Sequence, residues 1–323
     1  MGAGLEAAMT DHRIVGRYDR PMRLPTDDAL GIGLGSVADV VFGDPRRGHP
    51  VAVFGSGVSA VEKWMYDDSR PRGAAFAVGW IGVGTAAGLI ARRAGAVGAA
   101  AATFTALGGT SLAAIGDRIA DALDAGDIDG ARTLVAGLVG RDTTRLDEAG
   151  ICRAAVESIA ENTSDATVAP LFWGAVAGAP GMLGYRAANT LDAMVGYRSP
   201  RYQRFGWAAA RLDDVANLAP ARLTATLVGV AAAQPAAVWR SVRRDARLHP
   251  SPNAGVVEAA FAGALGVTLG GRTVYAHGTE DRPTLGDGPA PLAADLRAAV
   301  RLSRRVQRLS AALAVAAQFR RRR

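Results

Sequence analysis

Three carboxylates recur at helical spacing in the middle of the chain. Glu157, Glu161 and Asp165 are each four residues apart, so on a helix their side chains share one face. Like charges at this spacing repel each other, and the arrangement becomes favourable when a cation such as Mg²⁺ lies between them or when one group is protonated. The segment therefore predicts either a solvated acidic face or a cation site.

A second polar stretch follows further along the chain. Asn189 and Asp192 are three residues apart, as are Asp214 and Asn217, and each pair can share a helix face. Mg²⁺ usually takes one or two carboxylates and leaves its other positions to phosphate and water. Oxygen side chains in this pattern therefore indicate a magnesium and phosphate site.

Arginines and stiff turns accompany these acids. Arg198, Arg201 and Arg211 can each hold phosphate or carboxylate oxygens through two parallel hydrogen bonds, and arginines that flank a membrane segment are the alternative interpretation. The turn from His249 to Asn253 contains two prolines and precedes Glu258. Such a turn either serves only to reverse the chain or positions ligand contacts.

Several function classes lack their signatures. The chain has one cysteine and contains no GxxxxGK[ST] phosphate loop, CxxC pair or HExxH motif. Gly31–Gly35 departs from the GxGxxG spacing of a dinucleotide site, so helix packing is the better interpretation. The net charge is +7, but the arginines are spread along the chain without interleaved aromatics. We therefore expect no nucleic-acid partner.

The elements that must position these groups are apolar helices. The mean hydropathy is +0.12, and two uncharged runs, Ala74–Ala91 with 18 residues and Ala94–Gly116 with 23, flank the pair Arg92–Arg93. Each run is long enough to cross about 30 Å of hydrocarbon, and its glycines permit close helix contacts in lipid. The runs predict a membrane hairpin, and a soluble all-α binding protein with a buried hairpin is the alternative.

One apolar segment decides whether the two polar stretches can form one site. If Ala166–Tyr185 crossed the bilayer as a straight helix, the stretches would lie on opposite faces. Pro170 and Pro180, with glycines around the second, indicate a broken or re-entrant helix instead. We therefore predict that residues 157–165 and 189–217 meet.

The overall expectation is an all-α, polytopic membrane helical bundle with a broken or re-entrant central helix. Residues 1–28 form a polar leader in this interpretation, residues 29–319 a single membrane-embedded helical domain, and residues 320–323 a basic tail. The last helix, about Leu292–Phe319, alternates apolar and arginine positions. It is expected to be amphipathic, and to pack on the bundle or lie at the membrane interface.

Taken together, the polar stretches are similar to those of the CobD/CbiB family of cobalamin biosynthesis, the adenosylcobinamide-phosphate synthases. The resemblance covers most of the chain, from about residue 30 to residue 290, in family order and with similar spacing. It rests on Asp39–Pro50, Gly140–Thr144, Glu157–Asp165, Tyr185–Arg201, Arg211–Asn217 and His249–Asn253.

The resemblance implies a multi-pass inner-membrane ligase that uses ATP and Mg²⁺. Such an enzyme joins the propionate side chain of adenosylcobyric acid to aminopropanol, or its phosphate, through an amide bond. On this basis we expect catalytic roles for Glu157, Glu161 and Asp192, and metal-binding roles for Asp165, Asp213 and Asp214. Substrate- or phosphate-binding roles are expected for Asn162, Asn189, Arg198, Arg201, Arg211, His249 and Asn253.

The expected partners are the corrinoid, the amine and the lipid bilayer, together with a second copy of the chain or other cobalamin-assembly membrane enzymes. ATP is cytoplasmic, so we expect the site on that side, although counting charges around Arg92–Arg93 favours the opposite placement. A membrane transporter or regulatory membrane protein with an intramembrane carboxylate pathway is the alternative function. It would place Asp39 and Glu258 along that pathway and need no ATP hydrolysis.

Overall fold

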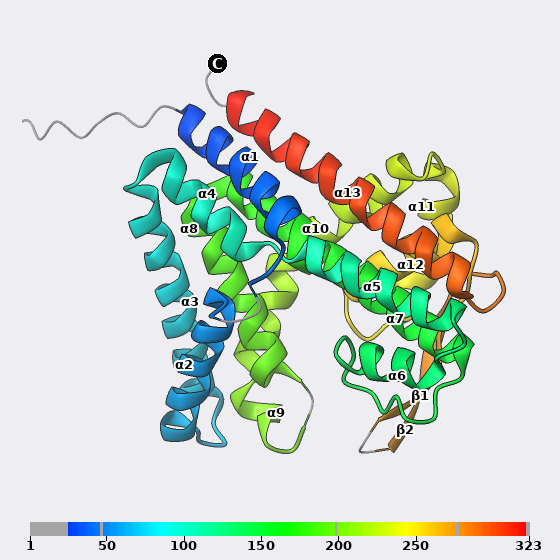
Figure 1. The fold of residues 1–323 in the computed structure, drawn as a ribbon. Coiled ribbons are helices and arrows are strands. Elements are labelled where there is room, and N and C mark those ends of the chain that lie inside the picture. Colours follow the sequence, from blue (N-terminus) through cyan, green and yellow to red (C-terminus); the bar gives the residue numbers. More distant parts are fainter. Residues whose placement is uncertain (1–24, 46–47, 198, 276–277, 321–323) are drawn as a thin grey trace, which may run out of the picture.

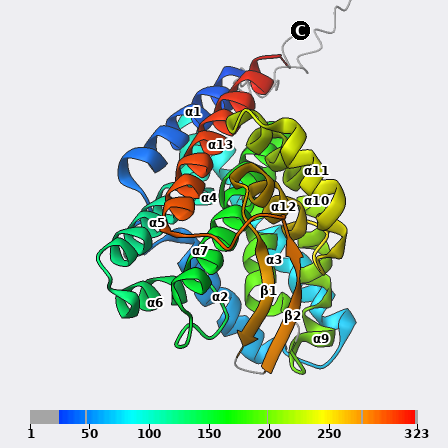
Figure 2. The same cartoon turned by 90° about the vertical axis from the view of Figure 1, so that its right-hand side faces the viewer.

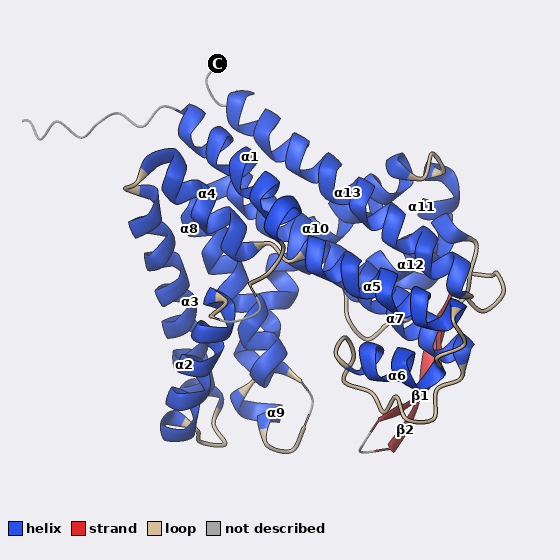
Figure 3. Ribbon diagram, in the orientation of Figure 1, coloured by secondary structure: helices blue, strands red, loops and turns tan. Residues whose placement is uncertain are grey.

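The computed structural model describes residues 25–45, 48–197, 199–275 and 278–320, which fold almost entirely as helices (Figures 1 and 3). The first helices are α1 Pro25–Phe42, α2 Pro50–Met65, α3 Arg70–Arg92, α4 Gly95–Ala106, α5 Gly109–Asp124, α6 Ile128–Ala136, α7 Glu148–Thr163, η1 Ser164–Val168, α8 Ala169–Leu191 and η2 Asp192–Gly196. The chain continues through α9 Tyr202–Phe205, α10 Trp207–Ala231, α11 Pro235–Asp245, η3 Ala246–Leu248, α12 Ala254–Leu265, β1 Leu269–Tyr275, β2 Gly278–Leu285 and α13 Ala293–Arg320.

Three segments of the described chain are long and apolar enough to cross a membrane, namely Arg70–Arg92, Gly95–Asp124 and Glu148–Gly196. The predicted all-α membrane architecture is therefore confirmed. The second predicted span is not one continuous helix, because Leu107 and Gly108 separate α4 from α5 and the Gly108 amide donates to the Ala166 carbonyl. Apolar side chains cover the outer surface of α1, α3 and α4, including Leu34, Val41, Phe42, Val78, Ile90 and Val97.

Glycines allow the membrane helices to approach closely. A Cβ atom on Gly84 of α3 would lie 2.7 Å from the Leu183 carbonyl of α8, and one on Gly88 would collide with Pro180. In the same way Gly31 and Gly35 of α1 face α4, which fits helix packing as the role of Gly31–Gly35. Gly79 and Gly82 have no neighbour within 4 Å, so only part of the glycine pattern serves helix contacts.

The central helix is broken, as expected, and the break lies at Gly178. This residue has φ 66° and ψ −158°, a conformation that is open essentially to glycine alone. The chain turns back there, because a Cβ on Gly174 would touch the Met182 side chain four residues beyond the turn. Pro180 follows the break and cannot supply the backbone N–H that a continuous helix needs.

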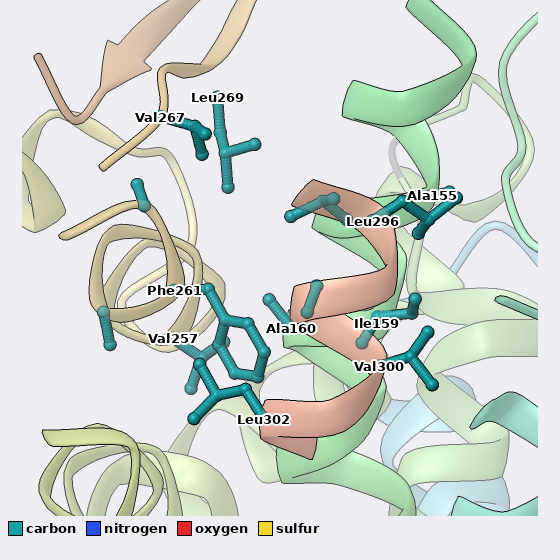
Figure 4. Close-up of a cluster of buried hydrophobic side chains, with 14 of the residues drawn as sticks. Ala155, Ile159, Ala160, Val257, Phe261, Val267, Leu269, Leu296, Val300 and Leu302 are labelled. Atoms are coloured by element: carbon teal, nitrogen blue, oxygen red, sulfur yellow. The ribbon is translucent and has the colours of Figure 1, made fainter. Parts of the chain in front are cut away.

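The last helix packs on the bundle, which selects one of the two expected placements. The α13 arginines pair with α5 acids: Arg297 with Asp121 at 2.8 Å and Arg304 with Asp117 at 2.6 Å. Its apolar face meets α7 and α12 in a buried cluster that includes Ile159, Phe261, Leu296 and Val300 (Figure 4). This core holds the polar face of α7 at a fixed position.

The strands were not predicted. The apolar run Ala259–Gly271 is divided between α12 and β1, and β1 pairs antiparallel with β2. The base of this hairpin lies next to α12, and the hairpin extends away from α13 (Figure 2). The expected leader lies largely outside the described residues, and so do Arg321–Arg323 of the tail. Helix α1 begins at Pro25, four residues before the expected start of the membrane domain.

Candidate functional site

The turn at Gly178 brings the two polar stretches together. The amide of Asn189 donates to the Asp165 carboxylate at 3.3 Å and to the Asp213 carboxylate at 3.4 Å. Asp165 and Asn189 lie thirteen and eleven residues from Gly178, about 16 to 20 Å along each arm at the helical rise. The predicted meeting of residues 157–165 and 189–217 is confirmed at Asp165, whereas Glu157, at the start of the first stretch, contacts Arg141 and Gly270 instead.

Two acidic residues of these stretches belong to π-helical turns. Asp165 lies in η1 and Asp192 in η2, and single π-helical turns inside longer helices often occur at functional sites. The wider turn rotates the following side chains relative to a regular helix. As a result, the four-residue spacing of Glu157, Glu161 and Asp165 does not by itself give the final direction of Asp165.

Neutral side chains hold the carboxylates in this cluster. Asn217 donates to Asp213 at 3.0 Å, and the Tyr185 hydroxyl donates to the Asn217 carbonyl oxygen at 2.9 Å. Asp213 and Asn217 are buried. We call Asp165, Tyr185, Asn189, Asp213 and Asn217 the amide–carboxylate cluster.

Arg186 lies beside this cluster without neutralising it directly. Its Nη1 atom donates to the Asn189 carbonyl oxygen at 3.3 Å, and its Nε atom is buried without a hydrogen-bond partner. Carboxylates taken out of water are costly unless a cation or several donors compensate them. A bound cation would therefore favour the ionised form of these carboxylates and offset their charge.

Three more carboxylates act on this cluster through space. Glu161 and Asp192 are within electrostatic range of Asp165, and Asp214 is within range of Asp213. Across the described ranges, no three His, Cys, Asp or Glu side chains converge as a ready-made metal cage. Two carboxylates and neighbouring amide oxygens nevertheless match the donors that Mg²⁺ takes when phosphate and water complete its shell.

A second cluster of charged groups lies where α7, α12 and the base of the hairpin meet. Glu157 pairs with Arg141 and also accepts a hydrogen bond of 2.7 Å from the Gly270 amide of β1. The side chains of Arg141 and Glu157 are only 6% and 4% exposed. We call Arg141, Glu157, His249, Glu258 and Arg282 the arginine–glutamate cluster.

His249, Glu258 and Arg282 complete this cluster. His249 Nε2 lies 3.7 Å from Glu258 Oε1, and Arg282 contacts both side chains. Burial, together with the charge of Arg282, lowers the pKa of His249 to about 4, so its ring is neutral at pH 7. Burial also raises the pKa of Glu258 well above its usual range, with Glu157 adding repulsion. One oxygen of Glu258 is buried without a partner.

The other predicted residues have separate partners. Arg201 pairs with Glu62 at 2.9 Å and stacks on Tyr66, and Arg211 forms an exposed pair with Asp214 at 3.2 Å. Asn162 donates to the Ser158 carbonyl of its own helix at 2.9 Å.

Asn253 joins the turn after His249 to α10. It accepts a hydrogen bond from Arg222 at 2.9 Å and donates to the Asp214 carbonyl at 2.7 Å. Arg198 lies outside the described residues.

Several residues of both clusters were not selected from the sequence. Tyr185, Arg186 and Asn217 fall inside stretches that carried the family resemblance, and Arg141 belongs to the stretch Gly140–Thr144. Their type and position in those stretches were the available signal. Arg282 lies outside those stretches. It belongs to β2, a strand that the sequence pattern did not predict, so nothing in the sequence indicated that it would lie near α7 and α12.

Comparisons with known proteins agree on one family. The family model described as CobD/Cbib protein matches residues 32–303. A protein of Mycobacterium tuberculosis named cobalamin biosynthesis protein CobD is 55% identical over 303 residues, covering 91% of this chain and 97% of its own length. Proteins with the same name from Chromobacterium violaceum and Rhodobacter capsulatus are each 45% identical, covering 90% and 80% of this chain and 97% and 86% of their own lengths.

No solved structure matches the chain. The family match spans most of the sequence and includes every stretch that forms the two clusters. The chain belongs to the CobD/CbiB protein family.

Proposed function

We propose that this protein is an adenosylcobinamide-phosphate synthase of cobalamin biosynthesis. It would join the propionate side chain of adenosylcobyric acid to aminopropanol, or its phosphate, using ATP and Mg²⁺. Family membership and the name of the relatives, cobalamin biosynthesis protein CobD, support the pathway. The amide–carboxylate cluster supports the chemistry, because the buried Asp213 and the half-buried Asp165 are held by neutral amides, and within the described part of the chain no ion pair with a cationic side chain is found for either.

Amide formation needs activation because a carboxylate does not acylate an amine at neutral pH. In the proposed reaction, a propionate oxygen takes the terminal phosphoryl group of ATP and ADP leaves. The amine nitrogen then attacks the acyl carbon, the bond to the phosphate oxygen breaks, and phosphate leaves as the amide forms. Positioning and charge stabilisation supply most of the catalysis in phosphoryl transfer.

The residues of the amide–carboxylate cluster have distinct roles in this proposal. Asp165 and Asp213 would hold Mg²⁺, with Asn189 fixing both carboxylates, and the ion would neutralise phosphate charge. Arg186 is better placed for a phosphate oxygen than Arg201 or Arg211, because its buried Nε has no partner while the other two form surface pairs. Glu161 is exposed to solvent beside both clusters and is proposed as the base that receives the ammonium proton.

We further propose that the protein lies in the inner membrane with this site open to the cytoplasm, where ATP is found. Charge counting does not decide the orientation, since Arg70 and Arg72 lie at one end of α3 and Arg92 and the following Arg93 lie at the other. Single cysteines placed at each end of α3 in a variant lacking Cys152 would report it by labelling from outside intact cells. The proposal requires the end nearer the site opening to be protected.

Purified protein in lipid nanodiscs tests the proposed reaction. ATP consumption should require adenosylcobyric acid, the amine and Mg²⁺ together, and should match the amide formed. Removing Mg²⁺ with a chelator should abolish turnover, and adding Mg²⁺ should restore it. Accumulation of substrate inside vesicles without ATP consumption would favour a transporter and contradict the proposal.

A further inference from the structure

The arginine–glutamate cluster contains a buried cation that is only partly satisfied. The side chain of Arg141 is 6% exposed, and one of its terminal nitrogens pairs with Glu157. The other terminal nitrogen, Nη1, is buried and has no hydrogen-bond partner. A guanidinium presents donors in a planar fork that suits two oxygens of one anion, so a free buried Nη1 points to an absent oxyanion.

The surroundings of Arg141 mix positive and negative groups. Arg282 and Arg141 both act on Glu161 and on Glu258 through space, and Glu157 pairs with Arg141. A simple anion would meet three carboxylates here. A ligand that carries both a phosphate and an ammonium group matches the alternation of arginine and glutamate side chains.

A solvent-exposed carboxylate lies near this cluster. Glu161 is exposed, although Glu157 and Ala160 on the same helix are buried. Glu161 is also within electrostatic range of Asp165 in the amide–carboxylate cluster. A small ligand beside Glu161 would therefore lie within electrostatic range both of Arg141 and of Asp165 in the proposed phosphoryl-transfer site.

We propose that Arg141 and Arg282 bind the phosphate of a small aminoalkyl phosphate whose ammonium group faces Glu161. The inference rests on the proposed function, because it identifies the subsite of the amine that is joined to the corrinoid. It assigns a specificity-determining role to Arg141, which distinguishes the phosphorylated amine from the free amino alcohol.

Binding without turnover tests the subsite separately from the ligase reaction. Full-length protein in nanodiscs, without ATP or corrinoid, is titrated calorimetrically with aminoethyl phosphate, ethanolamine, inorganic phosphate and a non-hydrolysable ATP analogue. Aminoethyl phosphate should bind at least about 10-fold more tightly than ethanolamine or inorganic phosphate, since each charge-assisted contact contributes roughly that factor.

The variants separate recognition from folding. Arg141→Gln combined with Glu157→Gln removes both members of the buried pair, so neither charge is left alone, and it should weaken aminoethyl phosphate about 10-fold or more. Arg141→Lys keeps the charge but loses the fork and should weaken this probe without changing binding of the ATP analogue. Arg145→Gln is the matched control, because Arg145 is exposed in the same loop.

Glu161→Gln provides a measurement that a purely structural role would not reproduce. It should weaken the binding of aminoethyl phosphate and leave the binding of inorganic phosphate unchanged.

The subsite would be overturned by Arg141 variants that bind aminoethyl phosphate as tightly as the parent protein does, or that lose binding of the ATP analogue instead. If the protein binds aminoethyl phosphate through Arg141 but forms no amide, the subsite holds and the proposed function fails. If the protein forms the amide but Arg141→Lys leaves the KM for the phosphorylated amine unchanged, the proposed function holds and the subsite fails.

Discussion

The two clusters surround their carboxylates with opposite kinds of partner. In the amide–carboxylate cluster, Asp165 and Asp213 receive hydrogen bonds from neutral amides, and negative charge is left for a ligand to balance. In the arginine–glutamate cluster, Glu157 is paired with Arg141, and what remains is an unused donor of the guanidinium. Burial alone therefore does not reveal what a carboxylate does, because its partners decide whether the site attracts a cation or an anion.

This comparison predicts that one kind of substitution, acid to amide, has different consequences in the two clusters. Asp213→Asn keeps the shape of the side chain, but it can accept only one of the two amide hydrogen bonds that Asp213 receives and it removes a charge that we assign to Mg²⁺ binding. Amide formation should fall by about 10²- to 10³-fold, the scale seen when one electrostatic contact to the reacting groups is lost. The measurement is the initial rate of amide formation at saturating Mg²⁺.

Asp124→Asn is the control for this substitution, since Asp124 lies in α5 and forms an exposed pair with Arg297, outside both clusters. Its activity should equal that of the parent protein. A fully active Asp213→Asn protein would remove Asp213 from the proposed magnesium site.

The corresponding change in the other cluster, Glu157→Gln, should act mainly on stability. It leaves the buried charge of Arg141 unpaired and replaces an ionic acceptor of the Gly270 amide. Breaking a buried pair from one side typically costs about 3 to 5 kcal/mol. Unfolding in mild detergent, followed by circular dichroism, should show this loss.

The double variant Arg141→Gln with Glu157→Gln should recover much of that stability, because no isolated charge remains. Equal losses in the single and double variants would mean that the ion pair itself is not the source of the effect. The single variant would then report packing around β1.

His249 makes the stability of the arginine–glutamate cluster depend on pH. Its pKa falls from 6.5 to about 4 because of burial and the charge of Arg282. The unfolded chain therefore takes up a proton at a higher pH than the folded chain does. The contribution of His249 to stability is complete above pH 6.5 and is lost as the pH falls toward 4, by up to about 3 kcal/mol.

The difference between the parent protein and His249→Asn isolates this effect, since the variant keeps Glu258 and the other titrating groups. The parent should lose more stability than the variant between pH 6.5 and pH 4, as measured by thermal unfolding in detergent. Parallel pH curves would show that His249 is protonated equally in the folded and unfolded states.

The sequence predicted the helices better than it predicted which side chains contact one another. Uncharged runs and prolines were sufficient to predict the membrane helices, and Pro180 with its glycines predicted the break that joins the two polar stretches. Charge type alone could not show that Arg201 and Arg211 form surface pairs, while the Arg141 side chain and the Nε atom of Arg186 are buried. That distinction depends on which face of each helix is covered, and for Arg282 on a hairpin whose short strands carry no strong pattern.

A substitution at Gly178 should affect one cluster and leave the other unchanged. The turn at this residue assembles the amide–carboxylate cluster, whereas the arginine–glutamate cluster is built from α7, α12 and the hairpin, which do not contain the turn. Gly178→Ala places a Cβ in a conformation that only glycine adopts readily, at a cost of about 1 to 3 kcal/mol. The expected result is reduced amide formation with unchanged binding of aminoethyl phosphate.

Gly79→Ala is the matched control, because a Cβ there meets nothing within 4 Å. If Gly178→Ala weakened both clusters equally, the two would form one cooperative unit and the proposed division between a cation site and an aminoalkyl phosphate site would not hold.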